Sequence, residues 1–273
     1  MRELQDFDKA LSAFKKQDIF VPDQVEVKKM IEYVYESNKL EGNQLNLYET
    51  TKVITENLTP ANKPLSDYLE AKGNFKAIRF SVMAARNKYP LTEKIVKEIN
   101  KNVLSSLWGI EDFYTSWKQS GQALGEYKVK KNKIEYQFEG KEGEIIPESI
   151  PENVSDRMKQ VIDKTNKSDT HLLKKAAYLA YQVFINQPFP DGNKRTARLL
   201  VTNLTMKEGL PLIVFNIQKK VTFNSALIET YLRKDQNIMT NFLCKEFTTA
   251  LYQMIEKDKE LKKGKDKGFT FTL

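Results

Sequence analysis

The sequence predicts an all-α protein in which a bundle of helices carries one small β-hairpin. Most of the chain has apolar residues recurring at three and four positions, which is the period of an amphipathic helix. Residues 121–147 instead carry four glycines around segments of alternating polarity, a pattern typical of paired strands. The chain has 273 residues and is 40% hydrophobic and 29% charged, which is enough for one large domain or two small ones.

Composition narrows the class of protein. No apolar run approaches the roughly 20 residues that span a bilayer, and the N-terminus lacks the apolar core of a signal peptide, so we expect no membrane partner. Cys244 is the only cysteine, which fits a reducing, cytoplasmic location, and its apolar neighbours predict a core position. The net charge of +8 is scattered among acidic residues, so a nucleic-acid partner is not expected.

The N-terminal part of the chain shows successive helical patterns separated by loop-forming residues such as the Pro60–Pro64 segment. The expected helices cover residues 4–14, 25–40, 47–58 and 67–85. Thr92 is expected to cap a further helix at 93–107. We divide the chain into an N-terminal helical region at 1–66, a core domain at 67–256 and a charged tail at 257–273.

The non-helical stretch is interpreted as a hairpin. Tyr127-Lys128-Val129 and Ile134–Phe138 alternate as strands do, and Lys131–Lys133 between them is the expected turn. The alternative is a surface hairpin without a function. Pro147 and Pro151 then precede a helix at 152–164.

His171 is the only histidine, and it lies 16 positions before Gln187. Over a helix that separation spans roughly 24 Å, so we expect a surface or capping role for His171 and no part in chemistry.

The most informative stretch runs from Gln187 to Arg198. An apolar helix at 176–185 ends at two prolines, and helical spacing resumes from Arg195. Such a helix-loop-helix directs backbone N–H groups at the start of the second helix outward, where they bind anions. Arg195 and Arg198 can grip phosphate, and the Asp191 carboxylate suits Mg²⁺. The alternative is an ordinary capped helix with two solvent-facing arginines.

This stretch, Gln-Pro-Phe-Pro-Asp-Gly-Asn-Lys-Arg-Thr-Ala-Arg, resembles the Fic family signature, His-Pro-Phe-x-Asp/Glu-Gly-Asn-Gly/Lys-Arg-x-x-Arg, at every position but one. The resemblance implies the all-α Fic fold, and transfer of AMP from ATP to a Ser, Thr or Tyr hydroxyl of a target protein. It implies Mg²⁺ on Asp191. It also implies a nucleotide site formed by Gly192, Asn193, Lys194, Arg195 and Arg198.

Three other segments extend the resemblance. Ser37, Glu41 and Gly42 match the family's inhibitory motif, Ser/Thr-x-x-x-Glu-Gly/Asn, which implies that Glu41 pairs with Arg198 and blocks the site of the ATP γ-phosphate. Residues 223–227 are similar to an element that closes the adenine pocket. The hairpin corresponds to the flap that holds the target by strand addition, here through Tyr127, Lys128 and Val129.

Gln187 stands at the position of the family histidine. A neutral amide cannot accept a proton, so the contribution of a general base, about 10²–10⁴ in rate, is expected to be lost. The explanations that remain are an engineered substitution, a weak natural transferase and a nucleotide-binding regulatory pseudoenzyme. Lys194 occurs in a phosphotransferring branch of the family, but the intact Gly192 favours adenylyl transfer. Self-modification and an oligomeric state stay open, as does a DNA-binding module.

Overall fold

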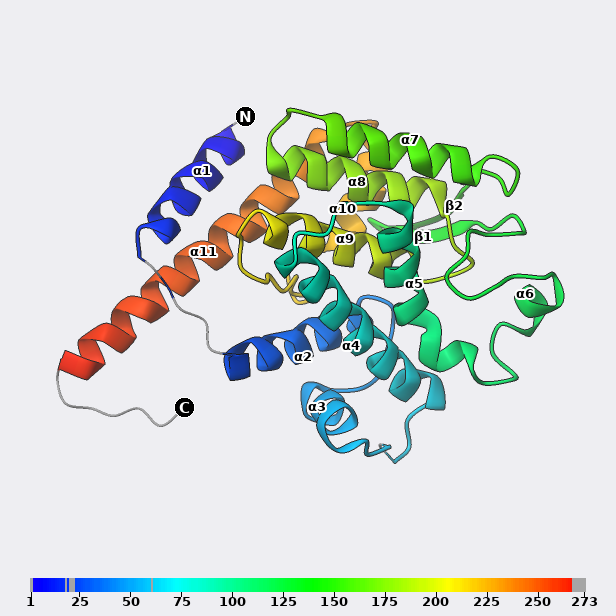
Figure 1. The fold of residues 1–273 in the computed structure, drawn as a ribbon, viewed down its shortest axis with the longest axis horizontal. Helices are drawn as coiled ribbons and strands as arrows, with labels where there is room; N and C mark the ends of the chain where they lie inside the picture. The colour runs from blue at the N-terminus through cyan, green and yellow to red at the C-terminus, as the bar shows by residue number, and fades with distance from the viewer. Residues whose placement is uncertain (1, 18, 20–22, 60, 267–273) are drawn as a thin grey trace.

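The computed structural model describes residues 2–17, 19, 23–59 and 61–266, which form a helical assembly with one two-stranded sheet (Figure 1). The helices are α1 (Arg2–Lys15), α2 (Asp23–Lys39), α3 (Leu47–Glu56), α4 (Leu65–Arg86), α5 (Glu93–Trp108), α6 (Thr115–Gln119), α7 (Val154–Lys167), α8 (Leu172–Asn186), α9 (Asn193–Lys207), α10 (Phe223–Arg233) and α11 (Asn237–Asp266). The strands are β1 (Ile134–Phe138) and β2 (Lys141–Ile145). The predicted all-α fold is confirmed, and each helix expected before residue 108 is present.

Helix α9 is the centre of the assembly. It packs against α4, α5 and α8, and almost its whole length from Asn193 to Thr205 is buried. Polar side chains lock it to α4, since the Ser81 hydroxyl donates to the Leu199 carbonyl at 2.9 Å and Asn203 Nδ2 donates to the Ser81 carbonyl at 2.9 Å. The loop at the start of α9 is therefore anchored to a buried helix that packs against three others.

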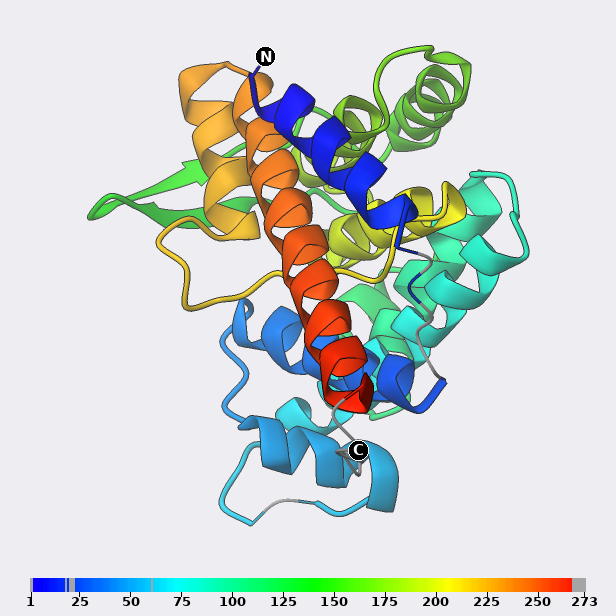
Figure 2. The same ribbon diagram turned by 90° about the vertical axis from the view of Figure 1, so that its left-hand side faces the viewer.

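The first and last helices lie side by side, far from each other in sequence. Figure 2 shows α1 lying along α11. Phe7 of α1 is 1% exposed and meets Phe247 of α11 edge-on, with ring centroids 6.3 Å apart. Because this contact is apolar and buried, the N-terminal helix is part of the same core as the C-terminal one.

The hairpin differs from the prediction. β1 pairs with β2, so that Ile134 faces Ile145 and Phe138 faces Lys141, and the expected strand at Tyr127–Val129 is wrong. Glu139 and Gly140 form the turn with φ of 49° and 75°, a positive-φ pair that suits a two-residue hairpin loop. Residues 127–129 cannot pair with β1 because Lys128 is buried and bonded to the loop before α9.

The C-terminal part of the chain is helical beyond the boundary expected at 256. Helix α11 continues without a break to Asp266, and residues 267–273 of the expected tail lie outside the described residues. Cys244 is fully buried in α11, which confirms its core position, and burial raises the pKa of its thiol to about 12. Within the described ranges, no helix combines the length and the apolar character needed to cross a membrane.

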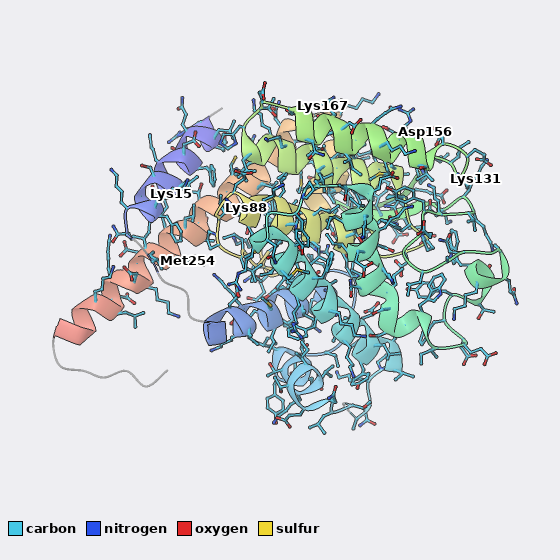
Figure 3. All side chains as sticks on the ribbon, in the orientation of Figure 1. Lys15, Lys88, Lys131, Asp156, Lys167 and Met254 are labelled. Carbon is cyan, nitrogen blue, oxygen red and sulfur yellow. The ribbon has the colours of Figure 1, made fainter. Side chains whose placement is uncertain are left out.

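Basic residues are distributed over the surface. Lys15, Lys88, Lys131 and Lys167 are exposed and lie on α1, after α4, before β1 and at the end of α7, respectively (Figure 3). The positive charge is therefore spread around the molecule, as the sequence predicts.

Candidate active site

The loop between α8 and α9 has a backbone that few residues adopt. Gln187 ends α8 with φ of 44°, and its N–H donates to the Val183 carbonyl at 3.1 Å. Gly192 precedes α9 with φ of 74°, and a Cβ added there would lie 3.1 Å from Val103 Cγ1. Glycine is favoured at 192 because a larger residue would be strained at this backbone angle and would press on the neighbouring helix.

Four consecutive carbonyls of this loop accept hydrogen bonds from outside it. Lys128 Nζ donates to Asn186 O at 3.0 Å, and its backbone N–H donates to Pro188 O at 2.8 Å. Asn132 Nδ2 donates to Gln187 O at 3.2 Å and to Phe189 O at 2.9 Å. Residues 128–132 therefore hold the loop by its backbone, where the two prolines have no N–H groups to contribute.

Lys128 is unusual because its buried ammonium has neutral partners. Besides Asn186 O, Nζ donates to Ser149 O at 2.7 Å and to Asn132 Oδ1 at 2.9 Å. Burial lowers the pKa of Lys128 to about 8. The carbonyl of Asn186 is also the end of α8, where a positive charge is stabilised by the helix dipole.

The start of α9 is an open anion site. No side chain caps this helix, and the backbone N–H groups of Asn193, Lys194 and Arg195 make no hydrogen bond to any described residue. The first N–H groups of a helix carry partial positive charge and have no partner within the helix. They can therefore bind a phosphate group.

Arg195 has donors without acceptors. Its side chain is 4% exposed, and its Nε and NH1 atoms are buried without a hydrogen bond to any described residue. NH1 lies 3.3 Å from Glu70 Oε1 and NH2 lies 3.4 Å from Asp191 Oδ2, so both carboxylates act mainly through charge. Burial alone would lower the pKa of Arg195, but these carboxylates raise it, so the side chain is always cationic.

Arg198 is fully buried and lies in a complete network. Its Nε donates to Ser37 Oγ at 3.0 Å and its NH1 donates to Asn224 Oδ1 at 2.8 Å. NH2 donates to Glu41 Oε1 at 2.7 Å, and the other carboxylate oxygen of Glu41 lies 2.8 Å from Lys194 Nζ. Burial raises the pKa of Glu41, but these cations outweigh it and lower the pKa to about 2.

The structure thus contains the Glu41–Arg198 ion pair that the family resemblance implies. Ser37 joins it, whereas Gly42 is exposed with φ of 91° and makes the bend after α2. Both arginines of the loop are buried, so the alternative of solvent-facing side chains is wrong.

Asp191 is half exposed and held from three sides. The Tyr114 hydroxyl donates to Asp191 Oδ2 at 2.7 Å, Arg195 lies beside the same oxygen, and the N–H of Gly192 donates to Oδ1. Burial, followed by the charge of Asp191, raises the pKa of Tyr114, so the hydroxyl remains a donor.

These residues fit Mg²⁺ that arrives with a nucleotide. No group of three or more His, Cys, Asp or Glu side chains in the described part of the chain could hold a metal ion by itself. Mg²⁺ is commonly bound by one or two carboxylates together with substrate phosphates and water. Asp191 provides one carboxylate next to the unpaired N–H groups of α9, which is what this mode requires.

Gln187 is buried, with 8% of the residue exposed, and both ends of its side-chain amide are hydrogen-bonded. Nε2 donates to Phe184 O at 2.7 Å and Oε1 accepts from Asn193 Nδ2 at 2.9 Å. The amide is therefore part of the loop's internal structure. His171, by contrast, caps α8 through Nδ1, which accepts from Leu173 N–H at 3.1 Å, and its capping role is confirmed.

Sequence reasoning missed three contributors to this site. Tyr114 contacts Asp191, Glu70 contacts Arg195, and Asn132 donates to the loop carbonyls. Each lies more than 50 positions from its partner, and no local motif marks it. Lys128 is predicted on a strand of the target flap, but it lies outside both strands and its side chain bonds to the loop before α9.

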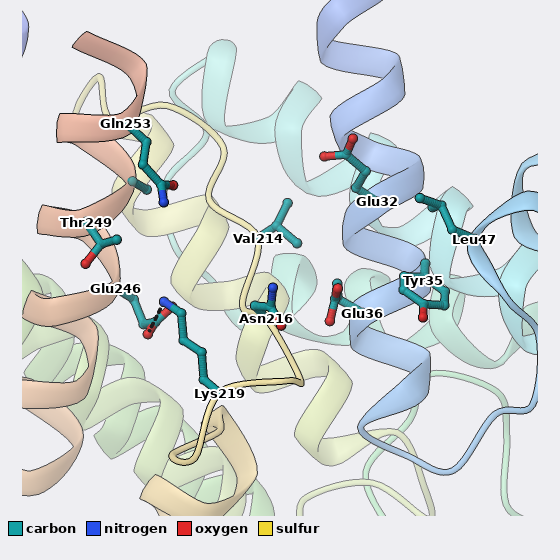
Figure 4. A pocket seen from close by; sticks show the side chains of 11 residues that line it. Glu32, Tyr35, Glu36, Leu47, Val214, Asn216, Lys219, Glu246, Thr249 and Gln253 are labelled. Carbon is teal, nitrogen blue, oxygen red and sulfur yellow. Dashed lines mark hydrogen bonds and ion pairs between the residues drawn. The ribbon is translucent and has the colours of Figure 1, made fainter. Parts of the chain in front are cut away.

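A cavity of about 310 Å³ lies apart from this loop, between α2, α11 and the connection from α9 to α10 (Figure 4). Glu32 and Glu36 of α2 face it, and an ion pair of 2.8 Å joins Lys219 to Glu246 on the opposite wall. None of the loop residues 187–198 lines it. The candidate anion site at the start of α9 is therefore separate from this cavity.

Known proteins are similar to this chain in sequence and in fold. Residues 90–205 match the model of the Fic/DOC family. The chain is 23% identical over 197 residues to Protein adenylyltransferase fic-1 of Caenorhabditis briggsae, with 71% of this chain and 35% of the relative covered. It is 24% identical over 195 residues to Protein adenylyltransferase Fic of Drosophila melanogaster, with 69% and 35% covered. The chain thus spans about a third of the length of the curated relatives that it matches.

Solved structures extend the likeness to nearly the whole chain. A Fic domain containing signaling protein from Bacteroides thetaiotaomicron VPI-5482 has a TM-score of 0.78 at 24% identity, covering 93% of this chain and 97% of that one. Fic-1 (aa134–508 E274G) from C. elegans has a TM-score of 0.75 at 18% identity, covering 94% and 72%. The protein thus has the helical fold of these Fic structures, and its residues 90–205 are similar to the Fic/DOC family.

Proposed function

We propose that this protein is an adenylyltransferase that moves AMP from ATP to a hydroxyl side chain of a target protein, that Glu41 restrains it, and that Gln187 weakens it. The observation that carries the proposal is the buried, cationic Arg195. Its Nε and NH1 donors have no hydrogen-bond acceptor among the described residues, and they lie on the same helix, α9, whose first backbone N–H groups are also unpaired. A buried donor without an acceptor is costly, so this arrangement favours an anionic ligand. ATP is the ligand suggested by the names of the curated relatives.

The residues of the loop divide the tasks of phosphate binding. The N–H groups of Asn193 and Lys194 surround one phosphate, while Arg195 and Arg198 provide charge-assisted hydrogen bonds to the others. Asp191 would hold Mg²⁺, which supplies neutralisation of phosphate charge when bound.

The transfer requires one bond to form and one to break. The target hydroxyl oxygen bonds to the α-phosphorus, the bond from that phosphorus to the β-phosphate bridging oxygen breaks, and pyrophosphate leaves. The hydroxyl proton must pass to an acceptor. The amide of Gln187 has no basic atom, and its Oε1 is already occupied by Asn193, so the proton-acceptor contribution of about 10²–10⁴ is absent.

Glu41 restrains the site by occupying Arg198. Since its pKa is about 2, the carboxylate is ionised throughout the neutral range and competes with phosphate for the same guanidinium. It also holds Lys194 at the mouth of the loop. Removal of the Glu41 carboxylate should therefore increase affinity for the nucleotide triphosphate.

A second candidate function is nucleotide binding without transfer. The specific observation in its favour is the position of the Gln187 amide, which is bonded at both ends and buried. Such a side chain contributes to loop structure and does not face a reacting group. A regulatory protein that senses ATP would need the anion site and not the base.

The test uses ATP labelled with ³²P at the α-phosphate, Mg²⁺ and a protein lysate. Four proteins are compared: the chain as given, Gln187→His, Glu41→Gly and the double variant. A control adds Asp191→Asn to the double variant, since this change keeps the side-chain shape and removes the charge. ATP binding by each protein is measured in parallel by calorimetry.

The proposal expects label transfer when histidine is present, more of it when Glu41 is absent, and none in the control. Transfer by the chain as given at the rate of Gln187→His would refute the lost-base account. If every variant binds ATP and none transfers the label, transfer is refuted and only the second candidate function, nucleotide binding, remains. Absence of ATP binding by Glu41→Gly would overturn both functions.

A further inference from the structure

The segment from Ile110 to Gln119 carries a bulky residue with a left-handed backbone, Tyr114, whose hydroxyl reaches the loop. Tyr114 has φ of 60° and ψ of 20°, the left-handed region that a bulky residue rarely adopts. Strained backbone persists where surrounding contacts impose it, and such residues cluster at functional sites. Neither the signature nor the inhibitory motif includes Tyr114.

Two contacts hold Tyr114 in this conformation, and one further hydrogen bond closes the segment around it. Its ring stacks on Trp108, with centroids 5.1 Å apart and planes at 23°. Its carbonyl accepts a hydrogen bond from the backbone N–H of Lys118 in α6, at 2.9 Å. Lys118 Nζ donates back to Ile110 O at 2.7 Å, which closes the segment on itself. The ring is thus held by the end of α5 and cannot rotate away freely.

The result of this arrangement is a directed hydroxyl. It donates to Asp191 Oδ2 at 2.7 Å across 77 positions of sequence. Among the described residues, the Asp191 carboxylate is otherwise contacted only by Arg195 at 3.4 Å and by the adjacent N–H of Gly192. Asn100 Nδ2 donates to the backbone carbonyl of Asp191 at 2.9 Å and leaves the carboxylate free. Of the residues that the structure describes, Tyr114 therefore supplies the one hydrogen bond to the Asp191 carboxylate from outside the loop and α9.

We propose that Tyr114 is a positioning residue that orients the Asp191 carboxylate for the Mg²⁺ complex of the nucleotide. This inference rests on the proposed function, because it assigns Asp191 to the metal. Partners behind a metal-binding carboxylate fix its orientation, and their loss typically costs about 10–100-fold in metal affinity or activity. Arg195 cannot take over, since its contact is longer and its charge is needed for phosphate.

The test separates metal affinity from nucleotide affinity. ATP binding is measured by calorimetry in EDTA and at increasing Mg²⁺, with Glu41→Gly as the reference protein so that Arg198 is free. Tyr114→Phe is added to this reference, because it removes only the hydroxyl and keeps the ring on Trp108. Tyr178→Phe is the matched control: it removes a hydroxyl from a partly buried ring of α8, away from the loop. Thermal midpoints of all three proteins report on folding.

We expect the three proteins to bind ATP equally in EDTA. Tyr114→Phe should then need about 10–100-fold more free Mg²⁺ to reach half of the increase in ATP affinity that the metal produces. Tyr178→Phe should match the reference. A Mg²⁺ requirement unchanged by Tyr114→Phe overturns the inference, as does an equal loss of affinity with and without metal. ATP binding that ignores Mg²⁺ in every protein also overturns it, but leaves the nucleotide site intact. A reference protein that binds no ATP refutes the proposed function, and the inference with it.

Discussion

Replacing Lys128 by methionine should change the stability of this protein in a pH-dependent way. Lys128 is 2% exposed, and its Nζ donates to Ser149 O, Asn186 O and Asn132 Oδ1, none of which is charged. Methionine keeps most of the apolar stem and removes the donor. At pH 7 we expect a cost of about 1–3 kcal/mol, the usual effect of leaving a buried acceptor without a partner.

The pH dependence follows from proton binding. Burial lowers the pKa of Lys128 from 10.5 to about 8, so between these values the unfolded chain binds more protons than the folded one. Stability rises with pH wherever the unfolded state binds more protons. With 1.36 kcal/mol for each pKa unit, the folded state gains about 3 kcal/mol between pH 8 and 10.5 from this side chain alone. The cost of Lys128→Met should therefore grow by about that amount.

Urea unfolding at a series of pH values from 7 to about 10.5 measures this difference. Other groups, including Cys244 and the buried tyrosines, titrate in both proteins and cancel when the two free energies of unfolding are subtracted. Lys131→Met is the control, since Lys131 lies in the same segment but is exposed, and its effect should stay within about 0.5 kcal/mol at every pH. A cost of Lys128→Met that is constant or shrinks with rising pH would show that the ammonium titrates normally and that the burial argument is wrong.

Glu41→Gln should remove stability that is present above pH 4.5 and is lost as the pH falls toward 2. The reason is that burial raises the pKa of Glu41, but Arg198 and its neighbours lower it to about 2. Urea unfolding should show a loss of about 3 kcal/mol at pH 7 that vanishes at pH 2. Gly73→Ala should lower the thermal midpoint, because its Cβ would overlap the Val103 carbonyl where α4 meets α5, at a cost of about 1–3 kcal/mol; an unchanged midpoint would mean that the two helices separate freely. His171→Ala should cost about 1 kcal/mol through the lost helix cap and leave ATP affinity unchanged, and a weaker ATP affinity would contradict the assignment of His171 to structure.

Sequence was sufficient where local physics decides the structure. The helices follow from apolar spacing, and the loop at 187–192 follows from prolines and from a glycine that needs positive φ. The hairpin failed because Tyr127-Lys128-Val129 alternates as a strand would, although Lys128 is buried by a contact 58 positions away. The Glu139-Gly140 pair was a usable local signal, since an acidic residue followed by glycine resembles the Asp-Gly of two-residue hairpin turns.

The site could be predicted only as far as its motifs reach. The resemblance implied the pairing of Glu41 with Arg198, 157 positions apart, which the structure contains. Tyr114 and Glu70 have no such pattern, because their role depends on how α4 and α5 bring them to the loop. A tyrosine in a polar stretch looks the same whether its hydroxyl meets solvent or a carboxylate.

The contacts of Arg198 explain how one site can be both restrained and ready. Three of its hydrogen bonds go to neutral acceptors, Ser37 Oγ, Ser37 O and Asn224 Oδ1, and one goes to the Glu41 carboxylate. If Glu41 leaves, the neutral acceptors still hold the guanidinium in place, but a buried cation then lacks a counter-charge, which is costly. Phosphate can supply that charge, so under the proposed function the site would keep its geometry when the nucleotide replaces Glu41. Glu41 is 14% exposed at its side chain and is followed by Gly42, whose φ of 91° and open surroundings permit the chain to move there without unfolding α2. Under the proposed function, competition between the two anions for a fixed arginine would be a sufficient switch, and it would require no rearrangement of α9.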